Sequence, residues 1–366
     1  MVKIATTLTH AGTDKNEVYG AITTPIYLST TYQHPEFGKS TGYDYTRTKN
    51  PTRAALENTL AKIEKGSVAL ALSAGMSAID LVLSSLPVGS SIIASRDLYG
   101  GTFRLLNYYN DRGQLKVLFG DNESDFGKLV EQNNDVKAIF LETPSNPLMN
   151  EIDITKVSTL AHKIGAVVIV DNTFYTPIIQ QPLTLGADIV VHSATKYLSG
   201  HNDVLAGVVV AKDEKIGKKL EVNLNMTGQV LSPFDSWLLL RGLKTLPLRI
   251  KQHEKNAKEI VNFLKKQSSI TKVYYTGRGG MVSFKVTDEN KIGDFLNHLN
   301  LISYAESLGG VESLITYPAT QTHADISREV RYSYGLTDDL LRISVGIEDV
   351  EDLINDLKNA LQVFEK

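Results

Sequence analysis

A lysine and an aspartate each follow a short apolar run that has the composition of a β-strand. Asp171 comes directly after the run at residues 166–170, and Lys196 lies shortly after the run at 189–191. An amine can form a Schiff base with the aldehyde of pyridoxal phosphate (PLP). A carboxylate can keep the pyridine nitrogen of PLP protonated, so that the ring accepts electrons. Either residue alone is most often a solvated strand end, but the pair indicates a PLP site.

Residues near this pair are suited to a phosphate group. Ser193 and Thr195 place two hydroxyls just before Lys196. Gly75 and Met76 lie in the segment SAGM, where an apolar run turns into a helical pattern. Glycine at such a turn lets backbone amides approach an anion, which the helix dipole also favours. A simple tight turn is the competing interpretation of this segment.

Three further places carry side chains of functional type. Tyr99 is followed by two glycines after a strand-like run, so it could stack on a flat ring or pack in the core. Tyr45 and Arg47 are two apart, so both can point the same way from an extended chain, although a solvated arm would look the same. Arg342 lies inside an apolar run and must have a partner, which is either a substrate carboxylate or an internal salt bridge.

The composition fits an ordinary globular protein and excludes several function classes. The chain has 366 residues, of which 42% are hydrophobic and 22% charged, with a net charge of −3. Such a balance gives no electrostatic footprint for nucleic acid, and no apolar run approaches the ~20 residues that span a bilayer. The absence of cysteine excludes disulfides, thiolate nucleophiles and cysteine metal sites. We expect a cytoplasmic protein without a metal, nucleic-acid or membrane partner.

Short runs rich in β-branched residues alternate with helical patterns through the middle of the chain. They lie at residues 91–94, 116–119, 138–141, 166–170, 189–191 and 207–211. This alternation predicts an α/β fold with a mostly parallel sheet covered by helices on both faces, and functional residues beyond the carboxyl ends of the strands. We expect an N-terminal arm at 1–49, a PLP-binding domain at 50–240 and an α+β domain at 241–366. A helix from Trp237 to Arg249, interrupted at Pro247, is expected at the last boundary.

With these segments in place, the whole chain resembles the Cys/Met-metabolism family of PLP enzymes. The resemblance rests on ordered motifs: DYTRTKNPTR (44–53), SAGM (73–76), DLYGGT (97–102), ETPSNP (142–147), VDNT (170–173), HSATKYL (192–198) and AESLGG (305–310). It implies PLP fold type I, the aspartate aminotransferase-like fold, with a mostly parallel seven-stranded sheet and a smaller C-terminal α+β domain.

The resemblance also implies roles for the residues that match these motifs. Lys196 is the Schiff-base lysine, Asp171 pairs with the pyridine nitrogen and Tyr99 stacks on the ring. The residues that match the phosphate cradle are Gly75, Met76, Ser193 and Thr195.

Other matches imply a shared active site and a substrate-binding group. Tyr45 and Arg47 match residues that reach the phosphate of the neighbouring subunit, with Tyr45 also of catalytic type. This implies a homotetramer built from two dimers with shared sites. Asn146, Ser307 and Arg342 fall where the family holds the cofactor phenolate or the substrate carboxylate.

Smaller features resemble one branch of the family. Glu306 fits the γ-synthase and γ-lyase pattern, and Asp44, Arg104 and the segment at 201–207 are similar to γ-synthases. The region around 275–281 is short, as in a compact group of Firmicute enzymes described as cystathionine γ-synthases with O-acetylhomoserine thiolyase activity.

The reaction implied by this branch is γ-replacement on an O-acyl-L-homoserine, the acyl group being acetyl or succinyl. L-Cysteine as nucleophile gives L-cystathionine for methionine biosynthesis by transsulfuration, and sulfide gives homocysteine. The alternative is a cystathionine γ-lyase that releases cysteine, 2-oxobutyrate and ammonia. A PLP-fold regulator without catalysis is a remote alternative.

Overall fold

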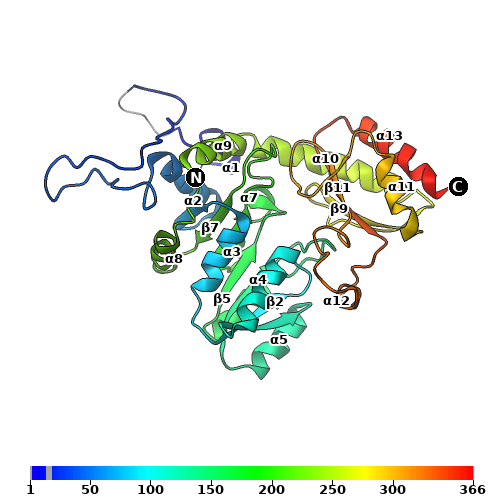
Figure 1. Ribbon diagram of the computed structural model, residues 1–366, viewed down its shortest axis with the longest axis horizontal. Helices are drawn as coiled ribbons and strands as arrows, with labels where there is room; N and C mark the ends of the chain where they lie inside the picture. Colours follow the sequence, from blue (N-terminus) through cyan, green and yellow to red (C-terminus); the bar gives the residue numbers. More distant parts are fainter. Residues whose placement is uncertain (1, 14–18, 366) are drawn as a thin grey trace.

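Seven strands form one sheet through the middle of the molecule (Figure 1). The structure is a computed structural model, and it describes residues 2–13 and 19–365. The spatial order is β1 (Val68–Leu72), β7 (Gly207–Ala211), β6 (Ile189–Ser193), β5 (Val167–Asp171), β4 (Val136–Glu142), β2 (Ser90–Ser95) and β3 (Leu115–Gly120). The strands from β6 to β3 are parallel, and β7 runs antiparallel to both of its neighbours. The predicted mostly parallel seven-stranded sheet is confirmed.

Both faces of this sheet are buried, which explains the continuous apolar runs. On β5, Val168 and Val170 pack into one hydrophobic cluster and Ile169 into the other. One face is covered by α3 (Gly75–Ser84), α4 (Gly100–Asp111) and α8 (Glu214–Thr227). The other face is covered by α2 (Pro51–Glu64), α5 (Glu123–Gln132) and α6 (Ile154–Lys163), and the short α7 (Thr176–Ile179) follows β5.

Two helices connect this domain to a second sheet. The sequence predicted one helix with a break at Pro247, but the structure has α9 (Pro233–Leu243) and then α10 (Leu246–Leu264). Pro247 lies in the first turn of α10, where a missing N–H costs nothing, so it begins a helix instead of breaking one. The predicted domain boundary at residue 240 falls inside α9 and stays a prediction.

The C-terminal part is a five-stranded sheet with helices on one face. Its strands, in order, are β10 (Ser303–Tyr304), β11 (Leu314–Thr316), β12 (Leu340–Ser344), β9 (Met281–Val286) and β8 (Ile270–Tyr274). The helices α10, α11 (Ile292–Asn297) and α13 (Val350–Leu361) pack on it, and α12 (Arg328–Ser333) lies in the connection to β12. Side chains alternate along β12, so Leu341 and Ile343 enter this core while Arg342 faces the larger domain.

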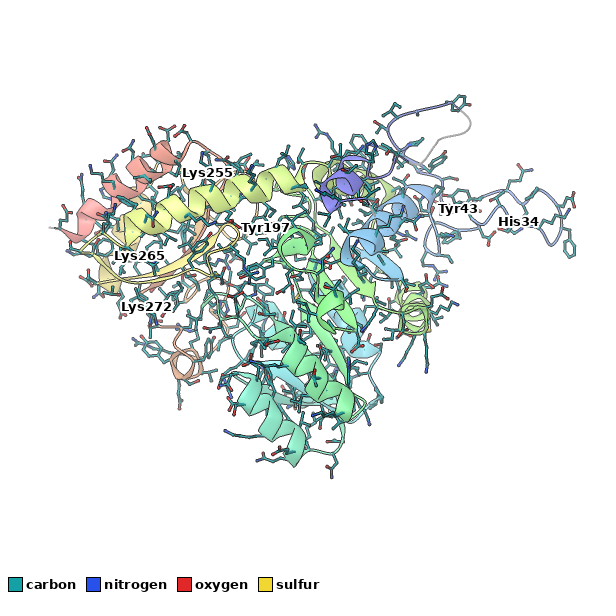
Figure 2. All side chains as sticks on the ribbon, turned by 180° about the vertical axis from the view of Figure 1, so that it is seen from behind. His34, Tyr43, Tyr197, Lys255, Lys265 and Lys272 are labelled. Atoms are coloured by element: carbon teal, nitrogen blue, oxygen red, sulfur yellow. The ribbon has the colours of Figure 1, made fainter. Side chains whose placement is uncertain are left out.

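The N-terminal arm projects from the body of the molecule. Figure 2 shows His34 and Tyr43 on a long loop away from the two sheets, and Phe37 is fully exposed. The beginning of the arm is anchored, because α1 (Ile4–Thr9) packs on α2 and buries Leu8. Residues 1 and 14–18 of the predicted arm lie outside the described residues. Within 2–13 and 19–365, no helix has the length and apolar character needed to cross a bilayer.

Candidate active site

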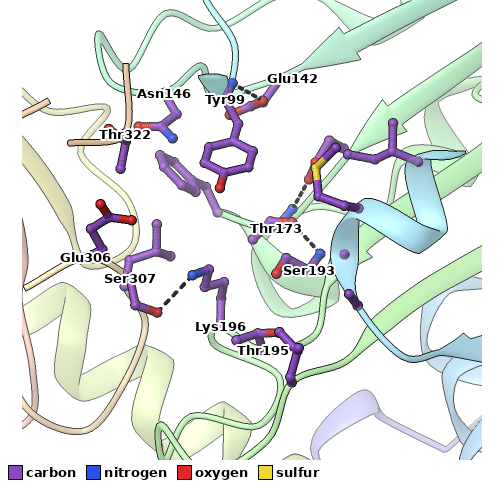
Figure 3. Close-up of a pocket in the computed structure, with 18 of the residues that line it drawn as sticks. Tyr99, Glu142, Asn146, Thr173, Ser193, Thr195, Lys196, Glu306, Ser307 and Thr322 are labelled. Atoms are coloured by element: carbon purple, nitrogen blue, oxygen red, sulfur yellow. Dashed lines mark hydrogen bonds between the residues drawn. The ribbon is translucent and has the colours of Figure 1, made fainter. Parts of the chain in front are cut away.

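A cavity of about 270 Å³ lies beyond the carboxyl ends of the central strands and is closed on one side by the C-terminal domain (Figure 3). Its wall contains residues that follow or end β1, β4, β5 and β6, together with the segment around Ser307 and Arg342 of β12. Parallel strands end at a common edge, which is why residues far apart in sequence meet here.

Lys196 extends into this cavity from the turn that follows β6. Its Nζ donates a hydrogen bond to Ser307 Oγ at 2.8 Å (Figure 3). Burial, and then the positive charge of Arg342, lower the pKa of the Lys196 amine from 10.5 to about 8, while Glu306 opposes this change. A neutral amine is the nucleophilic form, so a larger fraction of Lys196 is in that form near neutral pH than of an exposed lysine.

Asp171 ends β5 and lines the same cavity. Burial raises the pKa of its carboxyl group, while hydrogen bonds from Thr173 and the charge of His192 oppose that rise. The backbone N–H of Thr173 donates to Asp171 Oδ1 at 2.9 Å, and Thr173 Oγ1 accepts from the N–H of Ser193 at 2.9 Å. Thr173 therefore holds the ends of β5 and β6 together and fixes the direction of the carboxylate.

The start of α3 forms the phosphate side of the cavity. Ala74 precedes the helix and makes no side-chain cap, so the first amides of α3 remain available to an anion. Gly75 lies against Ser193, and a Cβ at Gly75 would come within 2.7 Å of Ser193 Cβ. Met76 and Thr195 line the same wall.

Tyr99 and Glu142 also line the cavity. The backbone N–H of Tyr99 donates to Glu142 Oε2 at 2.8 Å, and Tyr99 as a residue is 37% exposed, so it is accessible to a ligand in the cavity. The sequence did not single out Glu142, Thr173 or Thr322, which also line the cavity. Glu142 could have been found, because it follows the apolar run at 138–141 as Asp171 follows its own.

Arg342 is buried and lines the cavity. Its guanidinium donates to Asn146 Oδ1 at 2.7 Å, to Ser307 O at 3.1 Å and to Thr316 Oγ1 at 3.2 Å. No carboxylate lies within 4.0 Å of this guanidinium in the part of the chain that the structure describes, so the internal salt bridge is not found. Its charge is available to an anionic ligand.

Four of the predicted site residues do not line this cavity. Arg47 Nη1 donates to Asn225 O at 2.9 Å, and Tyr45 is about half exposed on the arm. Asp44 accepts from Ser40 Oγ, also on the arm. Arg104 is exposed and pairs with Asp325 on the surface. The roles predicted for Asp44, Tyr45, Arg47 and Arg104 therefore stay predictions.

The groups around the cavity fit PLP. The aldehyde, the pyridine nitrogen and the phosphate of PLP need an amine, a carboxylate and a set of amide or hydroxyl donors, respectively. Lys196, Asp171 and the start of α3 beside Ser193 supply these groups around one cavity. Tyr99 adds an aromatic ring next to them.

Comparisons with known proteins agree with this fit. The family model described as Cys/Met metabolism PLP-dependent enzyme matches residues 5–362. A Bacillus subtilis (strain 168) protein named cystathionine gamma-synthase/O-acetylhomoserine (thiol)-lyase is 51% identical over 358 residues, covering 98% of this chain and 96% of that protein. A protein of the same strain named cystathionine gamma-lyase is 45% identical over 379 residues, covering 99% of this chain and 100% of that protein. The solved structure of cystathionine gamma synthase from Xanthomonas oryzae pv. oryzae with aminoacrylate and cysteine matches with a TM-score of 0.97 at 40% identity, covering 100% of this chain and 99% of that one.

Proposed function

This chain belongs to the Cys/Met metabolism family of PLP-dependent enzymes, and we propose that it catalyses γ-replacement within that family. The substrate would be an O-acyl-L-homoserine, acetyl or succinyl, and L-cysteine would displace the acyl group to give L-cystathionine. Sulfide in place of cysteine would give homocysteine. The observation that carries this proposal is the 51% identity, over 98% of the chain, to the Bacillus protein named for both activities.

The residues of the cavity have separate tasks in this reaction. PLP, when bound, supplies the electron sink that stabilises negative charge on the substrate carbon next to the amino group. Lys196 Nζ accepts the proton from that carbon, and its pKa of about 8 gives it both a neutral and a protonated form near neutral pH. Arg342 holds the α-carboxylate by a charge-assisted contact worth roughly 1.5–3 kcal/mol. Glu306 lines the cavity beside Ser307, where the resemblance places a γ-specific residue.

The proposal includes a second copy of the chain. We infer that the arm that carries Tyr45 and Arg47 reaches the site of a neighbouring subunit, in a homotetramer built from dimers. The arm projects from the body and exposes apolar side chains such as Ile22, Leu28 and Phe37, as an arm that docks elsewhere would.

A cystathionine γ-lyase is the second candidate, favoured by the 45% identity to the Bacillus protein of that name. One assay separates the two: purified protein with PLP receives either an acetyl or succinyl homoserine ester with cysteine, sulfide or no thiol, or cystathionine by itself. Cystathionine formed from an ester and cysteine supports the synthase. Turnover of cystathionine alone, to cysteine, 2-oxobutyrate and ammonia, would replace it with the lyase. Lys196→Ala is the matched control for background chemistry.

A further inference from the structure

Glu142 is a buried carboxyl group in the cavity to which the proposed reaction assigns no task. It ends β4, and its Cα partner on the neighbouring parallel strand is Asp171, the last residue of β5. Both side chains line the cavity. Two carboxyl groups therefore stand side by side at the strand edge, although a single pyridine nitrogen needs only one.

Glu142 holds the segment that carries Tyr99. Its Oε2 accepts the backbone N–H of Tyr99 at 2.8 Å, directly before α4 begins at Gly100 (Figure 3). The Tyr99 ring also lies against Gly101, where an added Cβ would come within 2.4 Å of Tyr99 Cε1. The position of the Tyr99 ring thus depends on the acceptor that Glu142 provides.

The charges that face Glu142 are unbalanced. Asp171 on β5 and Asp97 after β2 are carboxyl groups, and Arg342 on β12 is the cation that opposes them. Arg342 directs its donors to neutral oxygens and makes no ion pair with Glu142. Burial and then the Asp171 carboxylate raise the pKa of Glu142 well above its usual range, while the Tyr99 N–H and Arg342 oppose this rise.

Asp171 is the better place for the one negative charge. Its Oδ1 accepts the backbone N–H of Thr173 at 2.9 Å. The Thr173 side chain and backbone and the charge of His192 all lower the pKa of Asp171 against the effect of burial. Glu142 has one backbone donor. Carboxyl groups on paired positions of neighbouring strands titrate as a pair. The negative charge stays on Asp171, because Thr173 and His192 favour its ionised form, whereas Glu142 faces the carboxyl groups of both Asp171 and Asp97.

We propose that Glu142 is a positioning residue of the cofactor site, a neutral carboxylic acid that anchors Tyr99 and leaves the negative charge on Asp171. It acts through these two residues and takes no proton from the substrate. This inference rests on the PLP site and is independent of which γ-substrate is used.

The test compares Glu142→Gln with Glu142→Leu, using PLP binding and the pH titration of the visible absorbance of the bound cofactor. Glutamine keeps an uncharged acceptor of similar shape. The midpoint of the pH titration should therefore be the same as in the parent protein, and the PLP affinity should agree within about twofold. Leucine leaves the Tyr99 N–H without an acceptor, so PLP affinity should fall about tenfold or more. Glu57→Gln is the matched control, because Glu57 Oε1 also accepts a backbone N–H, from Ala71 at 3.0 Å, and does not line the cavity.

Two results would overturn the inference. A midpoint shifted by about one pH unit or more in Glu142→Gln, with Glu57→Gln unchanged, would mean that Glu142 carries a charge. Unchanged PLP affinity in Glu142→Leu would mean that it positions nothing. Thermal unfolding of each variant without PLP identifies a folding defect. Neither readout needs an amino-acid substrate, so an error in the proposed reaction would leave both unaffected.

Discussion

The partly buried amine of Lys196 predicts a specific pH dependence of stability in the PLP-free protein. The folded-state pKa of about 8 lies below the ordinary value of 10.5, so the unfolded chain binds this proton more tightly than the folded protein does. The resulting penalty on the free energy of unfolding is complete below about pH 8 and disappears as the pH rises toward 10.5.

The size of the penalty follows from the two pKa values. The difference between 10.5 and about 8, at about 1.4 kcal/mol for each pKa unit, corresponds to about 3 kcal/mol near pH 7. That figure is an upper value, because one side of the amine faces the open cavity. By about pH 9.5 roughly half of the penalty should remain.

Replacement of Lys196 by methionine removes the titrating group and keeps a side chain of similar length. Urea unfolding without PLP should therefore show Lys196→Met more stable than the parent protein by up to about 3 kcal/mol near pH 7, with a difference that shrinks as the pH rises. Loss of the hydrogen bond to Ser307 shifts the stability difference by the same amount at every pH, so it does not change how the difference varies with pH. Lys255→Met, at an exposed position on α10, is the control: it shows how the loss of a surface lysine changes the free energy of unfolding over the same pH range. A difference that stays constant from about pH 7 to 10 would refute the low pKa of Lys196.

Three further predictions concern the cofactor, the substrate and the second subunit. Gly75→Ala should weaken PLP binding at least tenfold, measured by equilibrium dialysis, because its Cβ would come within 2.7 Å of Ser193 Cβ; unchanged affinity would contradict the close approach. Arg342→Lys should raise KM for the amino-acid substrate by roughly 10- to 100-fold in steady-state assays, because lysine lacks the planar fork of donors; an unchanged KM would remove Arg342 from the carboxylate site. Mixed subunits of Arg47→Ala and Lys196→Ala should recover part of the activity if sites are shared, whereas inactive mixtures would argue against a cross-subunit arm.

Much of the fold and of the site could be predicted from local patterns. The β-branched runs at 166–170 and 207–211 became strands because both faces of the sheet are buried, and no other element accommodates such runs as well. The prediction that Asp171 and Lys196 lie in one site required only the rule that parallel strands end at a common edge of the sheet.

What the sequence could not supply depended on long-range packing. Thr322 reaches the cavity from a loop of the C-terminal domain, and no local pattern marks such a position. The sequence could not decide whether Arg342 pairs with a ligand or with a carboxylate of the protein. The oxygens that surround its guanidinium, from Asn146 and Thr316, come from distant segments that only the folded chain brings together. The prediction of a break at Pro247 is wrong because, in sequence alone, a proline that opens a new helix looks the same as one that interrupts a helix.

The most direct measurement maps the residue that carries the cofactor. Borohydride reduction of the PLP-loaded protein fixes the cofactor to its lysine, and peptide mass spectrometry then locates the added mass. We expect the mass on the peptide that contains Lys196, and no added mass in Lys196→Ala. Labelling of another lysine, or labelling that persists in Lys196→Ala, would contradict the assignment of the active site.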